Sequence, residues 1–102
     1  MKHREKTAQE DARREEALYR AVLTLATVQE CRNFFRDLGT PAELQALADR
    51  WSVVALLKEG RPYREIHDLT GVSVTTIGRV ARFLIDGNGG YDLVWRRINA
   101  NG

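Results

Sequence analysis

The segment REIHDLTGVSVTTIGRV, from Arg64 to Val80, decides the fold that this sequence predicts. Its two halves carry apolar residues at helical spacing, and they meet at Gly71. Only a tight bend fits between them, and glycine suits it because a positive φ costs a residue with a Cβ atom about 1–2 kcal/mol. A helix, a short turn with glycine and a second helix form a helix-turn-helix, which we place at residues 63–86.

Apolar positions within this segment indicate how the two short helices are held together. Ile66, Val72, Ile77 and Val80 fall where buried side chains are needed to keep the helices at a steep angle. His67 is the exception, because a small residue usually lies where the two helices cross. A histidine there predicts a wider crossing or a tilted first helix.

The rest of the chain also has the pattern of helices, separated by caps and glycines. Thr27 with Glu30, and Thr40 with Glu43, are capping boxes that start two of these helices. Trp51 lies in the apolar stripe of the central helix, so we expect it in the core. The prediction is an all-α protein of about six helices, near residues 17–25, 28–38, 41–58, 63–69, 73–86 and 91–98.

The two ends of the chain differ in composition. Residues 1–12 are mostly charged or small, which predicts a disordered arm or the loose start of a helix. Residues 13–102 are predicted to form a single helical domain that contains the helix-turn-helix. A chain of 102 residues builds only a small core, so association with a second copy is a natural supplement.

Composition also excludes several classes of protein. The chain has no run near the ~20 apolar residues of a membrane helix, and its charged N-terminus does not resemble a secretory signal. A single cysteine, Cys31, indicates the reducing cytoplasm, and with His3 and His67 it offers too few ligands for a zinc site. We find no catalytic triad, paired carboxylates, phosphate-binding loop or metal cluster, so neither enzymatic activity nor a cofactor is expected.

The distribution of charge is more informative than its sum. The formal net charge is only +2, but residues 70–85 contain Arg79 and Arg82 and no acidic residue. Such a local excess of positive charge would attract the phosphates of a nucleic acid. A solvated helix face that merely lacks acids is the alternative interpretation.

In a helix-turn-helix bound to DNA, the second helix enters the major groove by its N-terminal end. Hydroxyl groups there can bond base edges, valine can touch the thymine methyl group, and arginines and the first helical turn can meet phosphate. Because no long base-reading side chain precedes Arg79, we expect modest base specificity with a large contribution from DNA backbone and shape. The predicted DNA-binding residues are Arg64, His67, Ser73, Val74, Thr75, Thr76, Gly78, Arg79 and Arg82.

The sequence also resembles a known family. TPAELQALADRWSVVALLKEG followed by REIHDLTGVSVTTIGRV is similar to the Trp repressor superfamily, and ECRNFFRDL and YDLVWRRI resemble its YerC/YecD-type branch. The resemblance implies an intertwined homodimer that acts as a transcriptional regulator on double-stranded DNA, most simply as a repressor. Its two helix-turn-helix units would then lie ~34–36 Å apart, one turn of B-DNA.

The resemblance also raises the question of a tryptophan effector. Thr40, Arg50 and Arg79 match residues that hold the ligand in the Trp repressor. Val80 stands where the family has a glycine that makes room for the indole, and Phe83 replaces a serine that binds the amino group. We therefore expect no tryptophan binding, while an unknown small-molecule effector stays open. The remaining alternative function is a protein-interaction module that keeps the helix-turn-helix shape without sequence-specific DNA binding.

Overall fold

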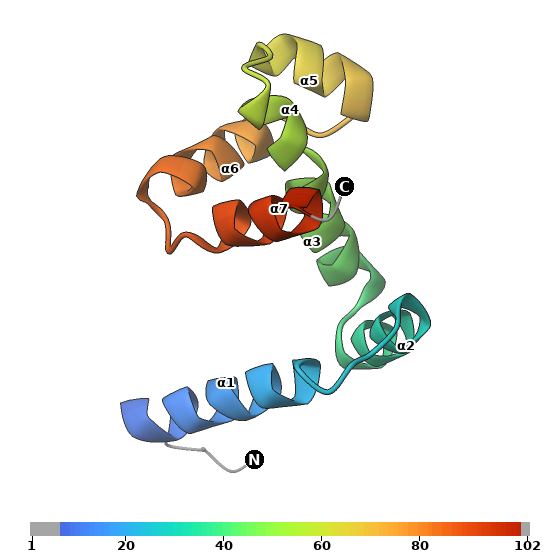
Figure 1. The fold of residues 1–102 in the computed structure, drawn as a ribbon, viewed down its shortest axis with the longest axis vertical. Helices are drawn as coiled ribbons and strands as arrows, with labels where there is room; N and C mark the ends of the chain where they lie inside the picture. Colours follow the sequence, from blue (N-terminus) through green and yellow to red (C-terminus); the bar gives the residue numbers. More distant parts are fainter. Residues whose placement is uncertain (1–6, 101–102) are drawn as a thin grey trace, which may run out of the picture. The chain divides into compact units, whose positions relative to one another are not determined.

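A computed structural model of the protein describes residues 7–100, and within them all regular structure is helical (Figure 1). The all-α prediction is therefore confirmed. The chain divides between Thr40 and Pro41 into two compact units, so the single domain at residues 13–102 stays a prediction. The N-terminal unit contains α1 (Ala8–Val22) and α2 (Val28–Leu38), and the C-terminal unit contains α3 (Pro41–Ser52), α4 (Val54–Lys58), α5 (Tyr63–Thr70), α6 (Val74–Asp86) and α7 (Gly90–Ala100).

The first helix begins earlier than a disordered arm over residues 1–12 would allow. Thr7 accepts a hydrogen bond from the backbone N–H of Glu10 (3.0 Å), and the Glu10 carboxylate accepts one from the backbone N–H of Thr7 (2.9 Å). This reciprocal capping box starts α1 at Ala8, so residues 8–12 are the start of a helix, the second of the two alternatives, and not a disordered arm. Residues 1–6 lie outside the described part of the chain.

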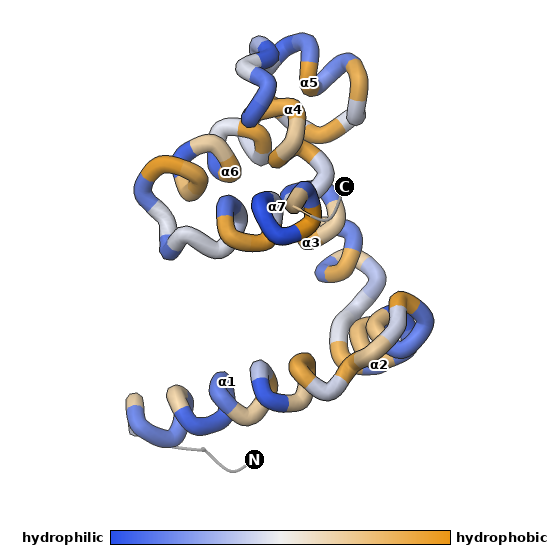
Figure 2. The backbone as a smooth tube through the Cα atoms, in the orientation of Figure 1, coloured by the Kyte–Doolittle hydropathy of each residue, from blue (hydrophilic) through white to orange (hydrophobic). Residues whose placement is uncertain are grey.

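The second helix has the predicted cap in a modified form. Thr27 accepts from the backbone N–H of Glu30 (3.0 Å), as the capping box requires. The Glu30 carboxylate instead accepts from the backbone N–H of Ala26 (2.9 Å), one residue before the cap. No residue of α1 or α2 is buried within the described chain. The apolar and polar residues that alternate along α1 (Figure 2) therefore form an amphipathic helix without a covered face.

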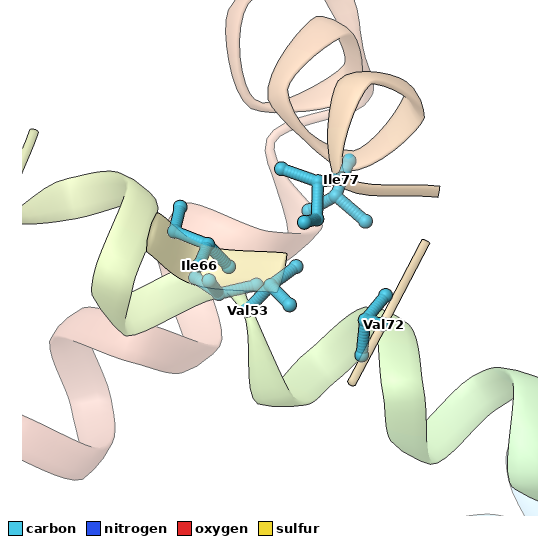
Figure 3. Packing of buried hydrophobic residues seen from close by; sticks show 6 residues of the cluster. Val53, Ile66, Val72 and Ile77 are labelled. Atoms are coloured by element: carbon cyan, nitrogen blue, oxygen red, sulfur yellow. The ribbon is translucent and has the colours of Figure 1, made fainter. Parts of the chain in front are cut away.

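The core lies in the C-terminal unit, and most of its residues belong to the helix-turn-helix. The four apolar positions predicted from the sequence, Ile66, Val72, Ile77 and Val80, are all buried. Val53 and Val54 complete the cluster (Figure 3). α6 packs against α3, α4, α5 and α7, and it is the central element of this unit (Figure 1).

The central helix predicted at residues 41–58 is divided at Val53, and this part of the prediction is wrong. The hydroxyl of Ser52, at the end of α3, donates a hydrogen bond to the backbone oxygen of Asp49 (2.7 Å) and competes with the helical pattern. Two β-branched residues follow, Val53 and Val54, and both are buried. A straight helix would place neighbouring side chains about 100° apart, so the break allows both valines to face the same core.

The last helix, α7, is fixed to the rest of the C-terminal unit by both polar and aromatic contacts. Lys58 of α4 forms a salt bridge with Asp92 of α7 and lies 5.1 Å from the centre of the Trp95 ring. The hydrogen bond from Lys58 holds the pKa of Asp92 below its usual value. Trp51 stacks on Tyr91 with ring centres 6.4 Å apart, but 37% of Trp51 stays exposed, so it is not the core residue that the stripe predicted.

None of the helices within residues 7–100 combines the length and the apolar character that crossing a membrane requires.

Candidate nucleic-acid interface

The bend between α5 and α6 depends on a glycine in the left-handed region. Gly71 has φ +77°, and its N–H donates to the backbone oxygen of His67 (2.8 Å), which ends α5. A Cβ atom at this position would meet no atom within 4 Å. The requirement for glycine is therefore conformational, as the sequence predicted, and it does not arise from crowding.

Side-chain hydrogen bonds within the turn also stabilise this bend. Nδ1 of His67 lies 2.8 Å from the backbone oxygen of Val72, and because a carbonyl only accepts, Nδ1 carries the proton. Thr70 donates its hydroxyl to Ile66 (2.7 Å) and accepts from the backbone N–H of Val72 (3.1 Å). His67 thus has a structural role that the sequence analysis did not anticipate. Its other ring nitrogen, Nε2, can donate to an external phosphate only when the ring carries both protons.

The first turn of α6 is capped by a hydroxyl pair. Ser73 accepts from the backbone N–H of Thr76 (3.1 Å) and donates to the Thr76 hydroxyl (3.0 Å). The N–H groups of Val74 and Thr75 precede the first bond within the helix, so they stay available for an anion. No acidic residue occupies the first turn of α6. The predicted phosphate contact therefore falls more on these backbone groups than on the Ser73 hydroxyl.

The exposed face of α6 carries the residues predicted to meet bases. We call Val74, Thr75 and Gly78 the reading face. Val74 is 49% exposed, Thr75 is exposed and Gly78 is partly exposed, whereas Ile77 and Val80 of the same helix are fully buried. The helix thus has a core side and a reading face, and none of the three residues is sealed inside. Arg64, Arg79 and Arg82 are also exposed.

Tyr63, the first residue of α5, lies beside the reading face and was missed by the sequence analysis. A Cβ atom built on Gly78 would lie 3.8 Å from Cε2 of Tyr63, so the tyrosine ring borders the glycine. The ring is 43% exposed. The available signal was an aromatic residue at the start of the first helix combined with a glycine inside the second, where glycine weakens a helix by about 1 kcal/mol.

Some of the residues compared with a tryptophan pocket make contacts within the chain. The Arg79 guanidinium lies 5.2 Å from the centre of the Phe83 ring, an arrangement typical of a cation–π contact. Val80 is fully buried in the core, and Arg50 is partly buried. Thr40 is the last residue of the N-terminal unit, so the five predicted positions do not all belong to one unit.

A hollow of about 430 Å³ opens on the C-terminal unit beside Phe83, one of these five positions. It lies between α3, the end of α6 and α7, and its lining is mostly apolar. The lining residues are Trp51, Phe83, Asn88, Gly90, Tyr91 and Val94.

Comparison with known proteins identifies the fold. Residues 14–99 match the family described as Trp repressor protein. The chain belongs to the Trp repressor family. This family consists of regulators, and the match confirms the resemblance inferred from the sequence.

Individual members of the Trp repressor family are similar over most of the chain. The uncharacterised protein YerC of Bacillus subtilis is 42% identical over 81 residues, which are 79% of this chain and 78% of YerC. The crystal structure of a TrpR-like protein from Eubacterium eligens is 42% identical, with a TM-score of 0.78, over 82% of this chain and 87% of that one. A candidate Trp repressor from Staphylococcus aureus is 36% identical, with a TM-score of 0.82, over 92% of this chain and 96% of that one.

Proposed function

We propose that this protein is a homodimeric, cytoplasmic transcriptional regulator that inserts α6 into the major groove of double-stranded DNA, most simply as a repressor. The observation that carries the proposal is the exposed N-terminal end of α6. It has free backbone N–H groups, an outward reading face and no acidic residue from position 70 to position 85. Membership of a family of helix-turn-helix regulators supports the same function.

The proposed contacts divide into phosphate and base contacts. Phosphates are bound by Arg64, Arg82 and the N–H groups at the start of α6, and by His67 when its ring carries both protons. These contacts set the position of the helix on the duplex. The reading face and Thr76 meet the base edges. Because Arg79 lies over Phe83, it contributes mainly positive charge, and direct reading of bases rests on short side chains. A large part of the specificity then comes from DNA shape.

A second copy of the chain explains the apolar surface that a single chain leaves uncovered. All six buried apolar residues belong to the C-terminal unit, whereas Leu23 is 83% and Val28 is 73% exposed in the N-terminal unit. The hollow beside Trp51 adds further apolar surface in the C-terminal unit. A dimer would cover such surfaces, and it would present two reading faces one helical turn of DNA apart.

The proposed regulator does not use tryptophan as a corepressor. The Phe83 side chain stacks under Arg79 within one chain, and the buried Val80 side chain fills the space that a glycine would leave. The contact that an aromatic ligand would make with Arg79 is therefore made by the protein itself. Isothermal titration calorimetry with tryptophan tests this point: no heat of binding is expected, and micromolar binding would contradict it.

Fluorescence anisotropy with duplexes selected from random DNA, at stated salt concentrations, tests DNA binding. Wild-type protein should select a palindrome with half-sites one turn apart and lose affinity steeply as salt rises. The double variant Arg79→Glu and Arg82→Glu should abolish binding. Arg13→Glu and Arg14→Glu, which make the same change of charge on the exposed face of α1, should retain most of it. If the α6 variant binds as well as wild type, the protein-interaction module becomes the better interpretation.

A further inference from the structure

Gly78 is a glycine that the described chain itself does not require. It lies inside α6, where glycine weakens a helix relative to alanine. Its φ is not positive, because Gly60, Gly71 and Gly89 are the glycines with positive φ in the described residues. An added Cβ atom would find only Cε2 of Tyr63 within 4 Å, at 3.8 Å, which is an ordinary van der Waals contact. Alanine would therefore fit this position.

Gly71 and Gly87, on either side of Gly78 in the sequence, are glycines that the chain does require. Gly71 is needed for its left-handed φ of +77°. At Gly87, a Cβ atom would lie 2.3 Å from the backbone oxygen of Phe83, so glycine is needed there to avoid a clash. Both requirements arise within the chain. No contact of the described residues requires a glycine at position 78, and its missing side chain leaves α6 open to close approach from outside.

Two side chains border the surface of α6 at Gly78. Val74 precedes Gly78 by four residues and therefore lies on the same face of the helix. The half-exposed ring of Tyr63 also borders Gly78. We call the space bordered by Val74, Gly78 and Tyr63 the notch. The Gly78 N–H is already bonded within the helix, so the floor of the notch offers neither a donor nor an acceptor.

We propose that the notch selects a thymine in each half-site by enclosing its C5 methyl group. This inference rests on the proposed function and adds the base that the reading face recognises. Among the groups that base pairs present in the major groove, only the thymine methyl group is apolar. The ring carbons of Tyr63 with Val74 and Gly78 give the notch an apolar lining that rewards that methyl group, whereas a cytosine amino group placed against these carbons would lose water without gaining a partner. The lack of acidic residues between positions 70 and 85 lets DNA approach α6 closely.

Replacing thymine by 2′-deoxyuridine removes the methyl group and keeps the base pair. In the selected duplex, each thymine is replaced in turn, and dissociation constants are measured by fluorescence anisotropy. For wild-type protein, one position in each half-site should lose about fourfold in affinity, which is what burial of one methyl group contributes. Other thymines should show little effect unless Val74 or Thr75 touches them.

Variants assign the effect to the notch. Gly78→Ala fills the floor, so it should weaken binding to the thymine duplex and remove the discrimination at that one position. Tyr63→Ala should also remove the discrimination, whereas Tyr63→Phe keeps the ring and should retain it. Asn99→Ala is the control, because this exposed residue of α7 lies outside the reading face and outside the hollow beside Trp51. Thermal unfolding checks that Gly78→Ala is at least as stable as wild type, as its better helix propensity requires.

The possible results separate this inference from the proposed function. If wild-type protein binds no duplex, both are wrong. If it binds a specific site in which no thymine is sensitive to loss of the methyl group, the notch is wrong and the proposed function stands. The same conclusion follows if Gly78→Ala keeps the full discrimination.

Discussion

The helix-turn-helix and the N-terminal unit are both built from capped, amphipathic helices, but only the first has a core within one chain. The six buried apolar residues lie between Val53 and Val80. α1 and α2 contain none. Helix formation is thus a local property that both regions share, whereas burial depends on what another element can cover. The helix-turn-helix finds its cover in α3, α4 and α7.

The N-terminal unit is held by interactions that contribute little by themselves. Arg20 pairs with Glu16 (2.6 Å), and the Tyr19 hydroxyl donates to Glu15 (2.6 Å), both within α1 and both exposed. Exposed pairs four residues apart contribute about 0.5 kcal/mol or less. Isolated helices of this length are marginal in water. The N-terminal unit therefore needs a partner surface, in agreement with the proposed dimer.

The largest effect is expected where the self-contained core is disrupted. Ile77→Ala removes a fully buried side chain at the centre of the helix-turn-helix and should lower the free energy of unfolding by about 2–5 kcal/mol. Ile85→Ala makes the same change on α6 at a side chain that is 82% exposed, so it should cost less than about 1 kcal/mol. Urea unfolding at one fixed protein concentration measures both. If both variants lost the same free energy of unfolding, the core would not be confined to the buried side chains.

The second-largest effect concerns the N-terminal unit, at the uncovered face of α2. Leu38→Lys places a charge on that face, while a cation suits the dipole at the end of the helix. If the face is a dimer interface, the dissociation constant of the dimer should rise by about 10–100-fold, or about 1.4–2.8 kcal/mol. Asp37→Lys is the control, because Asp37, which precedes Leu38 on the helix, is exposed and polar. Analytical ultracentrifugation measures both variants, and an unchanged dimer for Leu38→Lys contradicts the assignment.

The sequence predicted features that depend on local spacing and missed features that depend on contacts with other elements. Ile66, Val72, Ile77 and Val80 were predictable because short-range spacing alone determines which side of each helix meets the other. The break at Val53 was missed because it depends on two valines being covered by α5 and α6, which lie later in the chain. The approach of Tyr63 to Gly78 was also missed, since the two residues meet only after the bend has formed.

The candidate interface was predictable to the same extent. Charge and helix position indicated an exposed, acid-free end of α6, and the structure has it. Hydrogen bonds within the turn were not predictable, because the ring of His67 reaches Val72 only when Gly71 adopts its positive φ. The capping box at Thr7 had a clear local pattern, but the surrounding charges suggested disorder.

A smaller effect is expected at the bend itself. Gly71→Ala forces a Cβ atom into a left-handed φ of +77° and should lower the free energy of unfolding by about 1–2 kcal/mol. Gly71→Asn should cost less, because asparagine tolerates this region better. Urea unfolding of both variants gives the order. If alanine costs no more than asparagine, crowding or another constraint, and not the left-handed φ, governs this position.

The smallest effect concerns the salt bridge that joins α7 to α4. The hydrogen bond from Lys58, with further help from Arg96, lowers the pKa of Asp92 in the folded protein. A carboxyl group whose folded pKa is depressed stabilises the fold at pH values above its unfolded pKa, and this contribution is lost as the pH falls through the folded pKa. Asp92→Asn should therefore lower the melting temperature slightly at neutral pH and converge with wild type in acid. Asp86→Asn makes the same change of charge on the exposed end of α6 and is the control. Parallel melting curves for Asp92→Asn and wild type from neutral to acid pH would mean that the bridge adds nothing to the attachment of α7, and that the apolar contacts of Tyr91 and Trp95 hold this helix alone.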